Sequence, residues 1–493
     1  MSTAAANTVP WEDARRVRLM LCLFVTLITA VMLTALARQT LQDPDSWWHV
    51  RVGLDFLANR TFPTVDTYSY TFAGHPWIAK EWLGQVLMAL AYRAGGWNGV
   101  VALIIASLSL TVFLMAWFFS DWLKPTLAIG LAFVVAVLIS PIYTARPHIF
   151  TLPIIVVWTA WLFRAAREEQ APSLWLFPLL VLWANLHATF TLAYIIAAFA
   201  GLDFLTRTGV SKPGLLVKWI AFGLLCPVVS LLHPYGLQAI LATLTVAYGN
   251  EAVPLITEWR PFNAQEHVLQ EVALLMFLFG LLVSRLQVGW VKALFIIFTM
   301  HMFLTHMRFI YLFFLLVPVV LAVEVGQQYP SLSSATWMAE KRDRVEQFFA
   351  RRFYPICGVI AVVLIAAVTV LGNAYQVEPR QDTSAKDALA FAESHHLSGN
   401  VLNSYNFGGT LIFHGIKTYI DGRTDQLFLS GFTKSDDDMG TSAGKPLLEA
   451  QLKKYAISWA LLSAKDDRIP FFNDLGWKRA YSDEYAVIYV PGV

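Results

Sequence analysis

The stretch that decides the fold is LMLCLFVTLITAVMLTALARQTLQDPDSWWH, residues 19–49. Residues 19–37 carry no charge, and a helix needs about 20 predominantly apolar residues to cross the hydrocarbon core of a membrane. No small-residue cleavage site precedes the following loop, so we expect a retained span and not a signal peptide. Two carboxylates and two tryptophans follow closely, in the order Asp43, Asp45, Trp47 and Trp48. The sequence thus predicts an acidic pair at a membrane surface.

Further apolar runs continue this pattern along most of the chain. Two of them are long enough for more than one helix: 171–202 holds a span and most of another around a turn at 185–189, and 219–250 holds a span and a shorter helix after Pro234. The remaining runs each hold one span: 94–120, 125–145, 147–163, 267–284, 290–305, 309–325 and 353–372. With the first span and the two long runs, the sequence predicts about eleven spans in all.

Charge divides the chain into two parts. Of its 493 residues 57% are hydrophobic and 14% are charged, whereas soluble domains average about 25% charged. Residues 373–493 hold 27 of the 70 charges, which is typical of a soluble domain. We therefore expect a transmembrane domain at 1–372 and a soluble tail at 373–493, and a soluble globular enzyme is excluded.

The sequence excludes other classes of partner and site. The net charge of +2 comes with no basic run dense enough to track a phosphate backbone, which argues against nucleic acid. The three cysteines, Cys22, Cys226 and Cys357, all fall in apolar stretches, so they build neither a disulfide framework nor a CxxC metal site.

Lysine and arginine set the predicted orientation, because they are retained on the cytoplasmic side. With the N-terminus inside, the inner segments hold 16 of these residues, the outer loops hold 8 and the tail holds 12. This bias predicts a multi-pass protein of a bacterial inner membrane, with a cytoplasmic N-terminus and a periplasmic tail. The polar residues that suggest chemistry then nearly all fall on the outer face.

The first outer loop, residues 38–82, carries the acidic pair. Two carboxylates at short range can bind a cation, or one can take a proton while the other stays ionised. The alternative is structural: an aspartate caps an interfacial helix that starts at Ser46, and the two tryptophans are interface aromatics. Aromatic residues near the acids, such as Tyr68, Tyr70 and Trp77, would stack on sugar faces or bury in the interface.

An acidic motif of the form Asp-Pro-x-x-x-x-His/Arg directly after the first span resembles the first outer loop of GT-C glycosyltransferases. Among these enzymes the motif is distantly similar to that of the catalytic subunit of oligosaccharyltransferase and its archaeal relatives. Ile256-Thr257-Glu258 is similar to the family's Ile-x-Glu motif, and Ser404 to Gly408 looks like a degenerate copy of its Trp-Trp-Asp-Tyr-Gly signature. The chain resembles uncharacterised bacterial membrane glycosyltransferases more closely still, through the motifs Asp43 to His49, Arg146-Pro147-His148 and Asp421 to Asp425 among others.

The departures from the family pattern affect the acceptor and the metal. Asn406 replaces the aspartate of the signature, so transfer to an asparagine sequon is in doubt. The second outer loop, 140–148, has no carboxylate where oligosaccharyltransferases place metal ligands. A divalent cation, Mg or Mn, would rest on Asp43, Asp45 and Glu258; otherwise Arg146 supplies fixed positive charge and no metal is needed.

The resemblance implies a role for each candidate residue. Asp43 is the expected base and Asp45 a second carboxylate. A guanidinium presents a planar fork suited to phosphate, so Arg146 and Arg308, with His148 and His306, are expected at the donor phosphate. The expected sugar and acceptor contacts are Trp48, His49, Glu81, His187, His233, Glu258, Tyr405, Asn406, Asp421 and Arg423. A lone histidine at a span end is also compatible with a purely structural role. The turn at 421–425 is equally compatible with a tight turn that contains a neutralising ion pair.

The tail is expected to be a small α/β domain. Its predicted helices cover 386–395 and 447–455, and its predicted strands cover 401–404, 417–421, 457–462 and 485–490.

The predicted function is transfer of a sugar from a polyprenyl-phosphate or -pyrophosphate donor to a periplasmic glycan, lipid or protein. A glycan polymerase or ligase is an alternative with similar substrates. Transport of a lipid-linked glycan is another, although transporters tend to show internal repeats and ionisable residues at mid-membrane, and the sequence shows neither.

Overall fold

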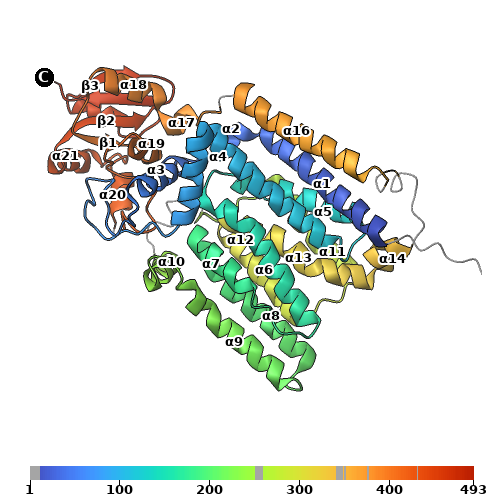
Figure 1. Ribbon diagram of the computed structural model, residues 1–493. Helices are drawn as coiled ribbons and strands as arrows, with labels where there is room; N and C mark the ends of the chain where they lie inside the picture. The colour runs from blue at the N-terminus through green and yellow to red at the C-terminus, as the bar shows by residue number, and fades with distance from the viewer. Residues whose placement is uncertain are drawn as a thin grey trace, which may run out of the picture.

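The computed structural model describes residues 11–249, 259–339, 348, 351–374, 377–429 and 431–492. In this part of the chain a bundle of apolar helices carries a small α/β tail at one end (Figure 1). Six helices are long and apolar enough to cross a membrane, and five shorter apolar helices accompany them. The chain is thus an integral multi-pass membrane protein.

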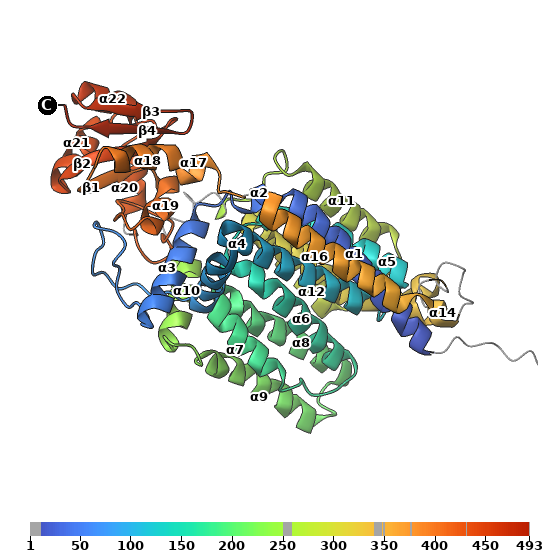
Figure 2. The ribbon, with the colours of Figure 1, turned by 45° about the horizontal axis from the view of Figure 1, so that its top comes forward.

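The bundle helices coincide closely with the predicted runs. In chain order they are α1 (Trp11–Ala35), α4 (Trp82–Phe119), α5 (Pro125–Leu138), α6 (Leu152–Arg167), α7 (Leu176–Leu186), α8 (Leu192–Thr208), α9 (Pro213–Ser230), α11 (Val268–Val283), α12 (Trp290–Thr305), α13 (Ile310–Gln328) and α16 (Phe353–Ala374). The predicted turn at 185–189 separates α7 from α8, and the short helix expected after Pro234 is α10 (Leu237–Gly249). Figure 2 shows α16 running beside α1, which agrees with the contacts between the two helices.

Short elements connect these helices. They are η1 (Ser140–Ile142), η2 (Pro147–Thr151), η3 (Ala188–Thr191), η6 (Met307–Phe309), η7 (Pro330–Leu332) and α14 (Ser334–Ala339). Three of them, η2, η3 and η6, lie at the end of the bundle that carries the tail, and each begins directly after a charged or histidine residue.

Helix α4 is broken near its first third. Gly95 and Gly96 have non-helical backbone angles, and the φ of Gly96 is +58°, a left-handed conformation that favours glycine. The break separates residues 82–94, which precede the apolar run predicted at 94–120, from the part that runs through the bundle.

Two helices form the start of segment 38–82, α2 (Ala37–Thr40) and α3 (Asp45–Asn59). Pro44 precedes the first residue of α3 with φ −63°, which suits a helix start, and the Asp43 carboxylate accepts a hydrogen bond from the Asp45 amide at 2.9 Å. The expected helix therefore exists and begins one residue earlier than predicted, but its N-cap position is Pro44, which provides no side-chain cap, and Asp45 is the first helical residue. Trp47 and Trp48 are buried and do not sit as exposed interface aromatics.

The tail contains a four-stranded mixed sheet in the order β1-β2-β4-β3. Strand β1 (Asn400–Asn403) pairs in parallel with β2 (Ile457–Ser463), and β4 (Ala486–Val490) pairs antiparallel with β2 and with β3 (Lys478–Ser482). Its helical elements are α17 (Gln381–Ser384), α18 (Lys386–Ser394), η8 (Tyr405–Phe407), α19 (Gly408–Phe413), α20 (Phe432–Asp438), α21 (Lys445–Lys454) and α22 (Ile469–Asp474). The predicted α/β tail is confirmed as a small mixed sheet with helices.

One predicted strand of the tail is wrong. Residues 417–421, all described, form no strand of this sheet, because other groups satisfy their backbone. The Asn403 side chain accepts from the Tyr419 amide at 2.9 Å and donates to the Ile420 carbonyl at 2.7 Å. Thr418 instead pairs with Ser69 of segment 38–82.

Segment 38–82 and the tail share one hydrophobic core. The cluster joins Trp48, Val52 and Trp77 to tail residues that include Tyr419 and Phe428. Burial of these aromatic side chains contributes about 2 kcal/mol each, so the two segments stabilise one another. The core thus places the tail over the end of the bundle.

Candidate functional site

A cavity with a volume of about 680 Å³ lies where the bundle, segment 38–82 and the tail meet. Its polar lining comes in part from α3, residues 77–81 and the tail. Arg146, His187 and His306, which directly precede η2, η3 and η6, also contribute to it. Much of its apolar lining comes from three helices and includes Leu192 and Ile195 of α8, Ile240 and Leu244 of α10, and Phe298 and Met302 of α12. The cavity is therefore amphipathic.

Glu81 stands between two histidines in this cavity. Its Oε1 lies 3.1 Å from Nε2 of His187, and its Oε2 lies 3.9 Å from Nε2 of His49. The Thr189 amide donates to Nδ1 of His187, so the proton of the neutral ring is on the nitrogen that faces Glu81. Helix α4 supplies Gln85, whose amide nitrogen lies 3.3 Å from Nδ1 of His49.

Burial dominates the protonation of this trio. It raises the pKa of Glu81 to about 7, although the neighbouring Lys80 acts to lower it. Burial also lowers the pKa of His49 and of His187 well below the usual value. Arg146 lowers the pKa of His49 further, and His148 lowers that of His187 further. At neutral pH the two rings are therefore uncharged, and Glu81 is poised to take up or release a proton.

The acidic pair is held by Arg146. Nε of Arg146 lies 2.7 Å from Oδ2 of Asp43, and its Nη2 pairs with Oδ2 of Asp45. Two backbone contacts align the chains that carry these residues: Ser46 donates to the Ala145 carbonyl, and the Ala145 amide donates to the Thr40 carbonyl. Asp45 lines the cavity, and Asp43 lies behind it.

Three cationic side chains line the cavity: Arg146, Lys80 and Arg308. Lys80 is buried and pairs with Asp425 of the tail. The guanidinium of Arg308 lies 4.4 Å from the ring centre of Trp259, and Nδ1 of His306 lies 2.8 Å from the Trp259 carbonyl. Positive charge thus reaches the cavity from three separate elements, which suits an anionic group.

The tail closes part of the cavity with the turn at residues 421–425. Gly422, Thr424 and Asp425 contribute to the lining. A Cβ atom at Gly422 would lie 1.7 Å from Oδ1 of Asp45, so only glycine allows the turn to pack this closely on the acidic pair.

The structure brings together most of the predicted site residues. Those that line the cavity are Asp45, Trp48, His49, Glu81, Arg146, His187, His306, Arg308 and Tyr405. His148 lies next to this group, with its ring centre 5.9 Å from that of His187.

Other predicted residues lie elsewhere. His233 is buried against the Lys80 carbonyl at 3.0 Å, and Asn406 is exposed on the tail. Glu258 lies outside the described residues.

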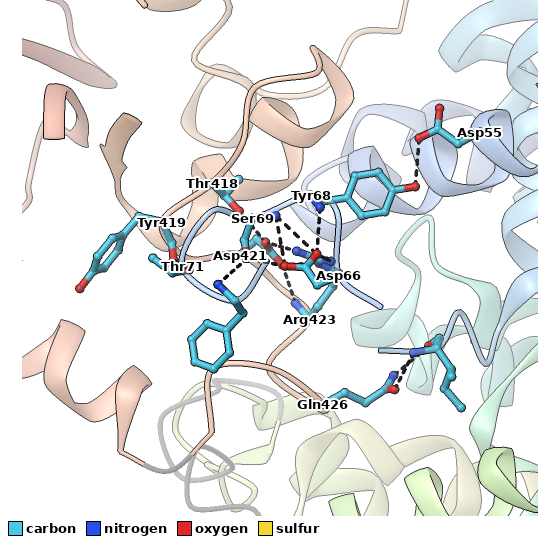
Figure 3. A network of polar contacts seen from close by, with 12 residues as sticks. Asp55, Asp66, Tyr68, Ser69, Thr71, Thr418, Tyr419, Asp421, Arg423 and Gln426 are labelled. Carbon is cyan, nitrogen blue, oxygen red and sulfur yellow. Dashed lines mark hydrogen bonds and ion pairs between the residues drawn. The ribbon is translucent and has the colours of Figure 1, made fainter. Parts of the chain in front are cut away.

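The predicted acceptor contacts of Asp421 and Arg423 need correction. Both side chains are fully buried, and they pair with each other and with Asp66 of segment 38–82 (Figure 3). A side chain without exposed surface cannot contact a ligand in the cavity. Their role is to join the tail to segment 38–82.

Sequence reasoning missed several polar residues that line the cavity, among them Lys80, Gln85 and Asp425. Lys80 directly precedes Glu81, and its position beside a predicted site acid could have indicated that it lines the site. Gln85 follows Glu81 by four residues, which places it on the same helical face. Asp425 lies in a quoted motif, but only the tertiary structure shows that it meets Lys80.

A divalent cation does not fit the described residues. The guanidinium of Arg146 occupies the position between Asp43 and Asp45 that a cation bound to both would take. Across the described ranges, no group of three histidine, cysteine, aspartate or glutamate side chains is arranged to hold a metal ion. The arrangement instead gives the acidic pair a fixed organic cation.

Comparison with known proteins finds similarity in structure only. No protein-family model and no curated protein sequence matches the chain. The archaeal oligosaccharyltransferase AglB from Archaeoglobus fulgidus, in complex with an inhibitory peptide and a dolichol-phosphate, matches 96% of this chain and 74% of its own, with 13% identity and a TM-score of 0.47. ArnT from Cupriavidus metallidurans, bound to undecaprenyl phosphate, matches 94% of this chain and 97% of its own, with 11% identity and a TM-score of 0.48. The chain is similar in structure to these proteins.

Proposed function

We propose that this protein is a GT-C-type membrane glycosyltransferase that transfers a sugar from a polyprenyl-phosphate or -pyrophosphate donor to an acceptor. The observation that carries this proposal is the amphipathic cavity. A polyprenyl-linked sugar has an apolar chain, an anionic linkage and a polar sugar, and the cavity offers apolar helices, three cationic side chains and a polar wall from the tail. The sequence motifs support the same donor class.

The donor phosphate is assigned to the cationic side chains. Lys80 and Arg308 lie on the cavity, and Arg146 reaches it between the two aspartates. Hydrogen bonds from charged donors to phosphate oxygens are short and strong, and they stabilise the negative charge that develops as the lipid phosphate departs.

The acceptor base is assigned to the acidic pair. In the proposed step, the acceptor hydroxyl oxygen bonds to the anomeric carbon, the bond from that carbon to the phosphate oxygen breaks, and the hydroxyl proton passes to a carboxylate. Asp43 is the residue that the resemblance implies as the base. The geometry favours Asp45, since Asp45 lines the cavity while Asp43 holds Arg146 from behind.

The setting follows from the charge distribution. The bias of lysine and arginine toward one set of loops supports a bacterial inner-membrane protein with segment 38–82 and the tail on the periplasmic side. The cavity would then open to donors and acceptors that have already crossed the membrane. Among the described residues six helices are long enough to span the membrane and five apolar helices are shorter, and the proposal of about eleven spans counts both groups.

The test is genetic and chemical. A strain that lacks the protein should accumulate a polyprenyl-linked sugar, which mass spectrometry of its lipids would identify. The Asp45→Asn variant should fail to complement, so the polyprenyl-linked sugar still accumulates. The amount that accumulates with Asp43→Asn measures how much transfer depends on the second carboxylate. Asp382→Asn, in an exposed tail ion pair, is the matched control. An unchanged lipid profile in the deletion strain, or full complementation by both aspartate variants, would overturn the proposal.

A further inference from the structure

A buried ionic cluster joins the tail to segment 38–82. Nε and Nη2 of Arg423 donate to the two carboxylate oxygens of Asp421, each at 2.8 Å, and Nη1 donates to Oδ1 of Asp66 at 2.5 Å. All three side chains are fully buried. Figure 3 shows the guanidinium between the two carboxylates, with Asp66 from one segment and Asp421 from the other.

Each carboxylate of the cluster accepts further hydrogen bonds from its own segment. Asp66 accepts from the Tyr68 amide at 2.9 Å and from the amide and hydroxyl of Ser69. Asp421 accepts from the Thr418 hydroxyl at 2.7 Å and from the Arg423 amide at 3.1 Å. The rings of Trp77 and Tyr68 cover the guanidinium, with centres 5.0 and 5.3 Å from its carbon.

Such a cluster contributes geometry more than stability. Burying three charges is costly, and apolar replacements of similar size are often as stable or more stable. A bidentate guanidinium, however, fixes the direction of both partners in a way that apolar packing and a lysine cannot.

The residues beside Arg423 in the chain are the ones that complete the cavity. Gly422 packs on Asp45, Thr424 lines the cavity, and Asp425 pairs with Lys80. Arg423 itself contributes no exposed surface.

We infer that Arg423 is a positioning residue, which clamps the turn 421–425 onto segment 38–82 and thereby holds the tail as a wall of the cavity. The meaning of that wall for sugar transfer rests on the proposed function. The clamp itself concerns structure alone, and it is tested by hydrogen exchange and infrared titration, which do not require sugar transfer.

Backbone contacts next to the clamp report docking directly. The Thr418 amide donates to the Tyr68 carbonyl at 3.1 Å, and the Tyr70 amide donates to the Thr418 carbonyl at 3.2 Å. These two amides are protected only while the tail is docked, whereas the amides of β2 (457–463) report whether the tail is folded.

The first experiment is hydrogen–deuterium exchange on the full-length protein in detergent micelles. Arg423→Lys keeps the charge but loses the fork, and Asp66→Asn leaves the Arg423–Asp421 pair of the tail in place. Both variants should exchange about a hundredfold faster at Tyr70 and Thr418, with unchanged protection of β2. Arg380→Lys, in an exposed ion pair of the tail, is the control and should match the parent.

Two results would overturn the clamp. Unchanged exchange at Tyr70 and Thr418 in both variants would show that other contacts dock the tail. Loss of β2 protection in both variants would show that Arg423 acts as a general stability residue.

A second readout links the clamp to the cavity. The charged and titratable groups that surround Glu81 are Lys80, His49, Arg146, His187, Arg308 and Asp425. Undocking removes Asp425 and admits water, and both changes stabilise the ionised carboxylate. The infrared band of the protonated carboxyl, assigned by its loss in Glu81→Gln, should therefore titrate at lower pH in Arg423→Lys than in the parent.

The two readouts separate the clamp from the proposed function. If exchange and the infrared titration both shift while the deletion strain shows no lipid-linked sugar, the clamp stands and the glycosyltransferase proposal fails. An infrared titration that stays at the parent position despite faster exchange would refute the claim that the clamp shapes the cavity.

Discussion

Replacing Arg146 with alanine tests the arrangement on which the acidic pair depends. The side chains of Arg146, Asp43 and Asp45 are 16%, 4% and 10% exposed, so water replaces little of the lost attraction. A pair of unit charges at 4 Å attracts by about 4 kcal/mol at an effective dielectric constant near 20, and removing one partner of a buried pair costs about 3–5 kcal/mol. We expect Arg146→Ala to lower the free energy of unfolding by about 3–5 kcal/mol.

The same variant tests the assignment of Arg146 as a substitute for a metal. Without the guanidinium, two adjacent carboxylates can bind a divalent cation, and a cation at a hundred times its dissociation constant restores about 2.7 kcal/mol. Denaturant unfolding of the purified protein, with and without Mn²⁺, measures both effects. Arg146→Lys retains the charge with one contact fewer and should lose about 2 kcal/mol.

Two outcomes would refute this reasoning. A loss below about 1 kcal/mol in Arg146→Ala would mean that the ion pairs contribute no more than exposed ones do. Equal stabilisation of the parent and the variant by Mn²⁺ would mean that Arg146 does not occupy the position of a cation.

Three further predictions follow from the cavity. Burial raises the pKa of Glu81 from 4.5 to about 7, so the folded protein holds a proton that the unfolded chain releases, and stability falls as pH rises through this window. In denaturant unfolding, Glu81→Gln should therefore gain about 3 kcal/mol over the parent at pH 8 and nothing at pH 4; a gain that does not depend on pH contradicts this. Gly422→Ala should raise hydrogen–deuterium exchange at residues 421–427, because the added Cβ causes a clash worth about 1–3 kcal/mol. Gly130→Ala, where the added Cβ meets open space, should leave exchange there unchanged. Equal exchange in the two variants would argue against close packing of the turn. Lys80→Met should weaken binding of undecaprenyl phosphate in native mass spectrometry by about tenfold, and Lys386→Met, in an exposed pair, should leave it unchanged; unaltered binding to Lys80→Met removes this residue from the donor site.

The membrane helices could be predicted closely because they depend on one local property. The runs at 267–284 and 290–305 differ by at most one residue at each end from α11 and α12. A charge-free stretch long enough to cross the bilayer has few alternatives, since unpaired backbone groups are costly in hydrocarbon. The first part of α4 was not predicted, because residues 82–94 lie before the apolar run.

The tail was less predictable because its backbone is satisfied by distant partners. Residues 417–421 alternate like a strand, yet the side chain of Asn403 and the backbone of segment 38–82 take up their hydrogen bonds. Strand β3 was missed because its charged and half-buried residues lack the alternation that marks a sheet face.

The site was predicted as a set of residues but not as a geometry. Orientation alone placed the acids, histidines and arginines on one face, and most of them line the cavity. The sequence left two roles open for Arg423 and Asp421, because an Asp-Gly-Arg turn looks the same whether it faces a ligand or forms an ion pair of its own. Only the position of Asp66, more than 350 residues away, decides between them.

The shared wall of the cavity has a consequence for how the protein is made. Segment 38–82 is synthesised early, whereas the turn 421–425 emerges only after the last bundle helix, α16, has been translated. The carboxylates of Asp43 and Asp45 therefore lack this part of their surroundings until the tail has been made and has docked on segment 38–82. If synthesis stops before the tail is made, the acids and arginines of the bundle end are present but the cavity lacks its tail wall. Under the proposed function, sugar transfer would therefore require a completely assembled chain.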